Sequence, residues 1–71
     1  MRDFREIITI LKLHLEKERP NKRIYDKDVA KMLGIEQSKF ATIKKRNSTP
    51  YVALLCYCKR EGICCNEIFF D

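Results

Sequence analysis

The sequence predicts an all-α protein, a compact bundle of five short helices. Apolar residues recur at the 3.6-residue spacing of amphipathic helices, and no stretch shows the apolar-polar alternation that is typical of a strand. Residues that start and end helices divide the 71-residue chain into five such segments. With two glycines, two prolines and no low-complexity stretch, the chain shows no sign of an internal linker. We therefore expect a single domain over residues 1–71.

The first helix is expected over about residues 3–18. Its core stripe follows the helical period and consists of Phe4, Ile7, Ile8, Leu11 and Leu15. Pro20 ends this helix, and the basic loop 21–23 follows. Two apolar residues, Ile10 and Leu13, fall outside the stripe. They are either ordinary exposed side chains or a contact for a second subunit.

Residues 26–45 predict two helices joined by a tight turn. Asp26 is expected to cap the first helix. Gly34 suits a helix end in the left-handed conformation, because a residue without a Cβ adopts it with little strain. The second helix is expected over about residues 37–46, and the polar residues 47–49 end it.

The residues around Gly34 stand at helix-turn-helix spacing. A small residue lies four positions before the glycine, where two helices that cross steeply leave no room for a large side chain. One apolar residue follows the glycine directly, and two more stand six and nine positions after it. With two apolar residues on one face of the first helix, this set is Ala30, Ile35, Phe40, Ile43, Val29 and Leu33. Many amphipathic helix pairs match part of this pattern, so the signal lies in the complete set.

The last two helices are also marked by their end residues. Thr49 is expected to cap the fourth helix, with Pro50 at its first position, and Gly62 ends it after about residue 60 or 61. Its expected packing residues are Val52, Leu54, Leu55, Cys56 and Cys58. A short helix over residues 65–70 closes the domain, and its expected core residues are Ile68 and either Phe69 or Phe70.

The net charge of +5 is unevenly distributed along the chain. Residues 1–36 hold nine Lys/Arg and seven Asp/Glu, whereas residues 37–60 hold six Lys/Arg and no acid. Residues 61–71 hold three acids, of which Asp71 is the last. The basic block begins where the second helix of the pair begins. A merely solvated surface more often mixes the two signs, so this pattern favours a surface that faces a polyanion.

The four cysteines permit three readings, a zinc site, a redox pair or buried structural thiols. The cysteines do not follow a CxxC spacing. Side chains that are two residues apart on a helix point in different directions. Two adjacent cysteines do not both face one metal ion without a special turn. His14, the one histidine of the chain, is the candidate for a further metal ligand. We expect structural cysteines and neither a metal nor a cofactor. The residues concerned are Cys56, Cys58, Cys64 and Cys65.

An enzyme is not expected from this sequence. It has no glycine-rich phosphate loop and no nucleophile motif, and the acids around the expected helix starts are accounted for by the helix dipole. No run approaches the ~20 apolar residues that cross a bilayer. The charged start MRDFREIITI lacks the cleavage region of a signal peptide. We therefore expect a cytoplasmic protein that does not contact a membrane.

The outer face of the helix at 37–46 carries side chains that can read base edges. Gln37 can bond adenine N6 and N7 together, and Lys39 can reach guanine O6 and N7. Ser38 is an adaptable donor and acceptor, and the methyl group of Thr42 can contact a thymine methyl. The expected phosphate contacts are Lys22, Arg23, Tyr25, Lys27, Lys44, Lys45, Arg46 and Asn47. The alternative is an ordinary solvated helix face, which the turn pattern makes the weaker hypothesis.

Three segments of the chain resemble one known family. They are VAKMLGIEQSKFATIKKRN, TPYVALLCYCKREGI and the end NEIFFD, and together they cover about residues 22–71. They are similar to the DNA-binding domain of phage CI-type repressors, which has the lambda-repressor-like helix-turn-helix fold. The resemblance implies a transcriptional repressor that binds operator DNA, usually as a dimer on a palindromic site. It also implies that the base-reading positions are Gln37, Ser38, Lys39 and Thr42.

Two expectations about partners follow. The first is double-stranded operator DNA bound by a weak homodimer, or by a dimer that forms only on DNA. Its candidate pairing residues are Ile10, Leu13, Phe69 and Phe70. The alternative is a protein-interaction module that uses the same helices to bind an anti-repressor or a polymerase subunit, with the basic block incidental.

Overall fold

The computed structural model describes residues 1–70, so Asp71 of the expected acidic end lies outside the described residues. Within that range the chain forms five helices and no strand, which confirms the all-α prediction. The helices are α1 (Phe4–Glu18), α2 (Asp26–Leu33), α3 (Gln37–Arg46), α4 (Tyr51–Glu61) and α5 (Cys65–Phe69).

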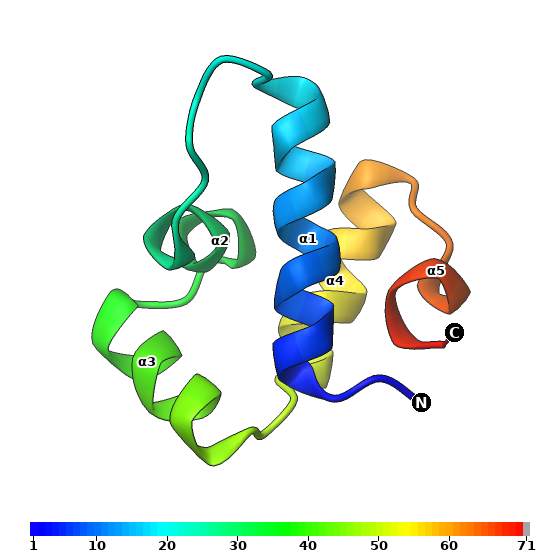
Figure 1. The fold of residues 1–71 in the computed structure, drawn as a ribbon. Coiled ribbons are helices and arrows are strands. Elements are labelled where there is room, and N and C mark those ends of the chain that lie inside the picture. Colours follow the sequence, from blue (N-terminus) through cyan, green and yellow to red (C-terminus); the bar gives the residue numbers. More distant parts are fainter. Residues whose placement is uncertain (71) are drawn as a thin grey trace.

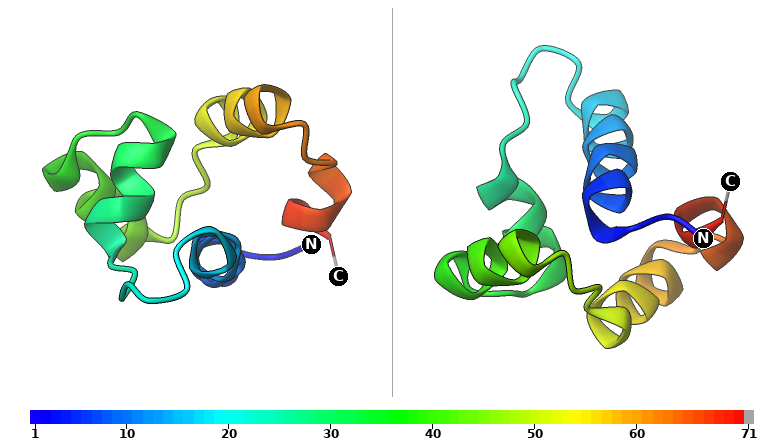
Figure 2. Two further views of the ribbon diagram at one scale, coloured as in Figure 1. Left: turned by 90° about the horizontal axis from the view of Figure 1, so that it is seen from above. Right: turned by 60° about the horizontal axis from the view of Figure 1, so that its bottom comes forward.

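Helix α1 is the central element of the bundle (Figure 1). It packs against α2 on one side and α5 on the other, while α2 also contacts α3 and α4. The other two views show α3 at the edge of the molecule and the N-terminal segment beside α5 (Figure 2). The N-terminal segment is attached there, because the Arg2 backbone N–H donates to the Phe69 carbonyl oxygen at 2.8 Å. Because α3 lies at the edge of the molecule, most of its residues are exposed to solvent.

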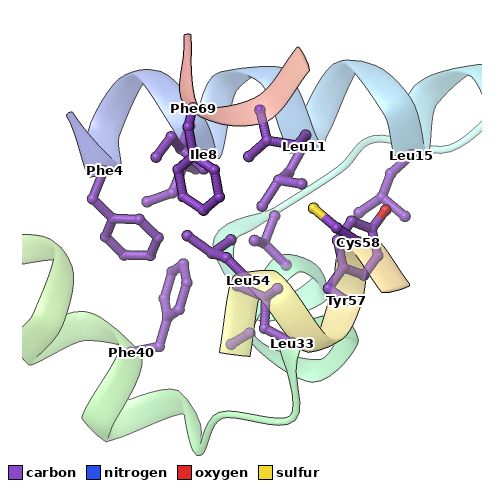
Figure 3. Close-up of a cluster of buried hydrophobic side chains, with 14 of the residues drawn as sticks. Phe4, Ile8, Leu11, Leu15, Leu33, Phe40, Leu54, Tyr57, Cys58 and Phe69 are labelled. Atoms are coloured by element: carbon purple, nitrogen blue, oxygen red, sulfur yellow. The ribbon is translucent and has the colours of Figure 1, made fainter. Parts of the chain in front are cut away.

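The core stripe of α1 is confirmed, since all five predicted residues are buried. Figure 3 shows the stripe facing side chains from α3, α4 and α5. The rings of Phe4 and Phe40 meet edge to face with centroids 5.7 Å apart, which attaches α3 to the start of α1. Ile10 lies partly buried against this core, whereas Leu13 is exposed.

Asp26 was expected to cap α2, and this is wrong by one residue. Tyr25 occupies the cap position, and its backbone N–H donates to the Asp28 carboxylate at 2.9 Å. Asp26 is the first helical residue. Its carboxylate turns toward two lysines of other helices instead of toward the backbone of its own helix.

The turn after α2 has the left-handed conformation that was predicted at Gly34. Gly34 has a φ of 71° and a ψ of 27°, in the left-handed region. The Ile35 N–H donates to the Ala30 carbonyl oxygen at 2.9 Å, and the Gly34 N–H donates to the Lys31 carbonyl oxygen at 3.1 Å. These two bonds satisfy carbonyls that the helix end would otherwise leave unpaired. The chain then needs only two further residues before α3 begins.

Helices α3 and α4 end in the same left-handed conformation. Asn47 ends α3 with a φ of 53°, and the Ser48 N–H donates to the Ile43 carbonyl oxygen at 3.1 Å. Gly62 ends α4 with a φ of 67°. Asparagine tolerates this conformation better than other residues with a Cβ, so it serves where glycine is absent.

The start and the inward face of α4 differ from the prediction. The helix begins at Tyr51, so Pro50 and not Thr49 stands at the cap, without a side-chain hydrogen bond. Leu54 and Cys58 are buried as expected, and Tyr57 is buried with them. The other three predicted packing residues are exposed and form a second apolar stripe on the opposite side, Val52, Leu55 and Cys56. Both stripes have helical spacing, so periodicity alone does not distinguish the inward one.

The closing helix α5 contributes Ile68 and Phe69 to the core and leaves Phe70 exposed. The Phe69 ring also contacts Tyr51, with centroids 5.7 Å apart. The tilted ring pair attaches the end of α5 to the start of α4 and closes the bundle.

Candidate nucleic-acid interface

Helix α3 presents a polar crest to solvent. Phe40 is buried and Ile43 packs against the core, which determines the inward side of the helix. Ser38, Thr42 and Lys45 therefore lie on the outer crest, and all three are exposed. The Thr42 hydroxyl donates to the Ser38 carbonyl oxygen at 3.2 Å, and the Ser38 hydroxyl donates to the Glu36 carboxylate at 3.0 Å.

Gln37 and Lys39 lie on opposite flanks of this crest. Two residues apart on an α-helix differ in direction by about 160°, because each residue turns the helix by about 100°. Gln37 borders a depression beside the start of α2, whereas Lys39 borders an apolar groove beside α4. Ser38 and Thr42 thus lie on the crest between Gln37 on one flank and Lys39 on the other.

Two depressions run along the Gln37 flank. The first, of about 570 Å³, lies between the starts of α2 and α3, and the second, of about 490 Å³, continues toward the start of α1. They form one continuous surface because both are lined by Asp26, Lys27, Gln37 and Lys44. Six Lys/Arg and one carboxylate line them together, so the surface is strongly basic. The basic residues are Arg5, Lys12, Arg23, Lys27, Lys44 and Lys45.

Tyr25 forms an exposed platform at the edge of the first depression. The Arg23 guanidinium and the Lys27 ammonium each lie 5.6 Å from the centre of its ring. These cation–π contacts place two positive charges next to one aromatic ring. Lys22 is exposed nearby but lines neither depression.

Asp26 links three helices through ion pairs. Its carboxylate lies 2.6 Å from the Lys12 ammonium of α1 and 2.5 Å from the Lys44 ammonium of α3. The hydrogen bond from Lys12, followed by that from Lys44, lowers the pKa of Asp26 from its ordinary value of 3.8. The carboxylate offsets part of the charge of both lysines. Lys44, predicted to contact phosphate, is therefore engaged inside the protein.

The far end of α3 supplies the remaining predicted phosphate contacts. Lys45 lies on the crest and borders the second depression, which Arg5 also lines. Arg46 is exposed, on the same flank as Lys39 by the helical period. The Asn47 side-chain amide donates to the Asp3 carboxylate at 3.4 Å, so it too has a partner within the protein.

Arg5, Lys12 and Ala41 are among the residues of this surface that were not predicted from the sequence. Ala41 is exposed one turn after Gln37, and its small side chain leaves the backbone of α3 accessible. Helical periodicity alone would have identified it. Arg5 has no such signal, because the contact of Phe4 with Phe40 brings it to α3 from a distant part of the sequence.

The cysteines divide into buried and exposed thiols, all of them free. Burial first, and the neighbouring Cys65 thiol second, raise the pKa of Cys58 to about 11. Cys56 is exposed on α4, and Cys64 is exposed at the position that precedes α5. His14 is half-buried, and among residues 1–70 no three His, Cys, Asp or Glu side chains converge as a metal site would require.

No helix in the described part of the chain is both long and apolar enough to cross a membrane. Comparisons with protein-family models, with curated proteins and with solved structures found no match for this chain. What the protein binds is therefore inferred from its own residues and their geometry.

Proposed function

We propose that the protein binds double-stranded DNA and reads its sequence with α3. The observation that carries the proposal is the exposed polar crest of α3 beside a continuous basic surface lined by six Lys/Arg. An α-helix fits the major groove of B-DNA, where each base pair presents a distinct pattern of donors and acceptors. The small side chains of Ser38, Ala41 and Thr42 would let such a helix approach the base edges closely.

Charge on both flanks of the crest supports this binding mode. Arg5 and Lys27 border it on the Gln37 side, Lys45 stands at the far end of the crest itself, and Lys39 and Arg46 lie on the other side. The two phosphate backbones run along the two walls of the major groove. Cations on both flanks suit both backbones, and such contacts orient a protein without reading sequence. In this arrangement Gln37, Ser38 and Thr42 are the base readers, and Lys39 contacts a phosphate or a flanking base.

We extend the proposal to a repressor-like transcriptional regulator with a helix-turn-helix. Gly34 joins α2 and α3 in the left-handed conformation that the pattern requires. The three segments that resemble phage CI-type repressors include this turn. Recognition of a particular operator by α3 is the function that these features jointly favour.

A second candidate is a protein-interaction module. The observation in its favour is the exposed apolar stripe of α4, which binding of DNA by α3 leaves uncovered. If this candidate is correct, the basic surface only keeps the protein in solution and binds no ligand. The partner would then be a protein such as an anti-repressor or a polymerase subunit.

Salt dependence distinguishes the two candidates. Duplex binding, followed by fluorescence anisotropy, is expected to weaken by orders of magnitude between roughly 50 and 200 mM salt, because each phosphate contact releases about one counterion. A random-sequence duplex and a single strand of the same length serve as controls. Absence of duplex binding even at low salt would reject DNA as the ligand and favour the protein-interaction module.

A further inference from the structure

The outward side of α4 exposes several large apolar side chains next to one another. Val52 is 76% exposed and Leu55 48%, and the exposed ring of Tyr51 extends this surface toward α5. Residues 47–58 contain no charged side chain, although 35% of the chain is charged. An uncharged stripe of this kind on a soluble helix is typical of a contact surface.

A groove of about 390 Å³ between α3 and α4 adjoins this stripe. Ile43, Pro50 and Val52 are among its apolar lining residues, and Lys39 is the only charged residue among the described residues that line it. The groove lies on the flank of α3 opposite Gln37, so the basic depressions and the apolar groove are on different sides of the crest. A partner seated in the groove would leave the proposed base-reading residues free.

We propose that the outer stripe of α4 and this groove receive a second copy of the chain, related by a two-fold axis; this inference rests on the proposed function. Each copy carries a net charge of +5, so two copies repel unless they meet through a neutral surface. The stripe is neutral and lies beside the proposed DNA-reading helix. Pairing there sets two copies of α3 on one duplex, as palindromic operators require.

The small area of the surface explains why DNA should be needed for pairing. A few exposed apolar side chains provide on the order of a few hundred Å² per copy, below the ~800 Å² per partner of a stable interface. The free chains are thus expected to associate weakly. On adjacent half-sites the effective concentration is much higher, so the same contact becomes cooperative binding.

The other pairing residues suggested by the sequence provide less surface. Ile10 is packed against the core. Leu13 is 50% exposed, but it stands on α1 beside the charged residues Lys12, Glu16 and Lys17. A single exposed leucine in a charged setting requires no partner. It does provide a matched control, because its exposure is close to that of Leu55.

The test compares Leu55→Gln with Leu13→Gln, both neutral changes at exposed leucines. Two measurements are made in reductant: sedimentation equilibrium of the free chains at up to millimolar concentration, and binding to duplexes with one or two copies of a selected half-site. Leu55→Gln is expected to abolish the weak association and the cooperativity on paired half-sites, and to retain wild-type affinity for a single half-site. Leu13→Gln is expected to behave as wild type in both measurements.

Each result bears on a different part of the proposal. Cooperativity that survives Leu55→Gln, or that is lost in Leu13→Gln instead, overturns the α4 surface and leaves DNA binding intact. If no duplex is bound, the proposed function fails, and sedimentation alone decides on the surface. A wild-type chain that stays monomeric at millimolar concentration then rejects a second copy as the occupant, whereas association lost only in Leu55→Gln supports it.

Discussion

Asp26 is expected to influence both the stability of the fold and the proposed binding of DNA. Its carboxylate pairs with lysines of α1 and α3 and so offsets charge at the centre of the basic surface. In Asp26→Asn these two ammonium groups are released toward the surface that we propose faces DNA. Affinity for random duplex is expected to rise, and the slope of log affinity against log salt to steepen by about one to two. An unchanged slope would show that Lys12 and Lys44 do not face the DNA.

The same ion pairs predict how stability changes with pH. Because the folded-state pKa of Asp26 lies below its ordinary value of 3.8, the stabilisation is present above that pH and is lost as the pH falls through the lower folded-state value. The carboxylate is partly exposed, so its contribution is at most about 1 kcal/mol. Acid unfolding of wild type and Asp26→Asn should therefore converge at low pH. A difference in stability that persists there would point to a packing defect.

The thiols are expected to react in the order of their exposure. Cys58 is buried and its pKa is raised to about 11, so at pH 8 to 9 it is protonated and shielded. Iodoacetamide should modify Cys56 and Cys64 first, and Cys58 only after unfolding. Mass spectrometry of peptides taken over time measures this order, and a denatured sample is the control. Early modification of Cys58 would contradict its position in the core.

At the scale of the helices, the left-handed ends allow a matched comparison. A Cβ at Gly34 would meet no atom within 4 Å, so the positive φ, and not a lack of room for a Cβ, opposes a substitution there. Gly34→Val should therefore lower the free energy of unfolding by more than about 1 kcal/mol, because a β-branched residue resists positive φ. Gly34→Asn should lower it less, and Asn47→Gly should leave it unchanged or raise it.

Thermal melting of these three variants measures the order. Equal losses for Gly34→Val and Gly34→Asn would show that positive φ is not the source of the effect. Each substitution is read against wild type at one pH, so the charge of the protein is the same in every comparison.

The success of the element predictions follows from the local nature of the signals. Helix ends depend on nearby residues such as Gly34, Asn47 and Gly62, and the bounds of α3 agree with the prediction at both ends. The inward face of α4 was partly mispredicted because both of its apolar stripes have helical spacing. Only their packing distinguishes them, since one contacts the core and the other faces solvent, and the local sequence does not determine this. The prediction that Asp26 caps α2 used only its local position in the sequence. It was wrong because Asp26 pairs with Lys12 and Lys44, which lie on other helices.

At the scale of the whole molecule, the fold brings distant residues of like charge to one side. Arg5 of α1, Lys27 of α2 and Lys45 of α3 are separated in sequence but line one surface. The charge asymmetry along the chain indicated a basic face, yet only the packing of α1 against α2 and α3 determines which residues form it. Gln37 and Lys39 are only two residues apart in the sequence, but the helix places them on opposite flanks of α3.

The central claim is that α3 reads base sequence while its far end binds phosphate. Its most direct test is selection of a preferred site from random duplexes, followed by titration of wild type, Gln37→Ala and Lys45→Ala on that site and on a shuffled duplex. Gln37→Ala is expected to weaken binding to the preferred site by ~1–3 kcal/mol and binding to the shuffled duplex very little. Lys45→Ala should weaken both about equally and lower the salt slope by ~1. If the selection yields no preferred site, or if Gln37→Ala weakens both duplexes equally, α3 does not read sequence through this face.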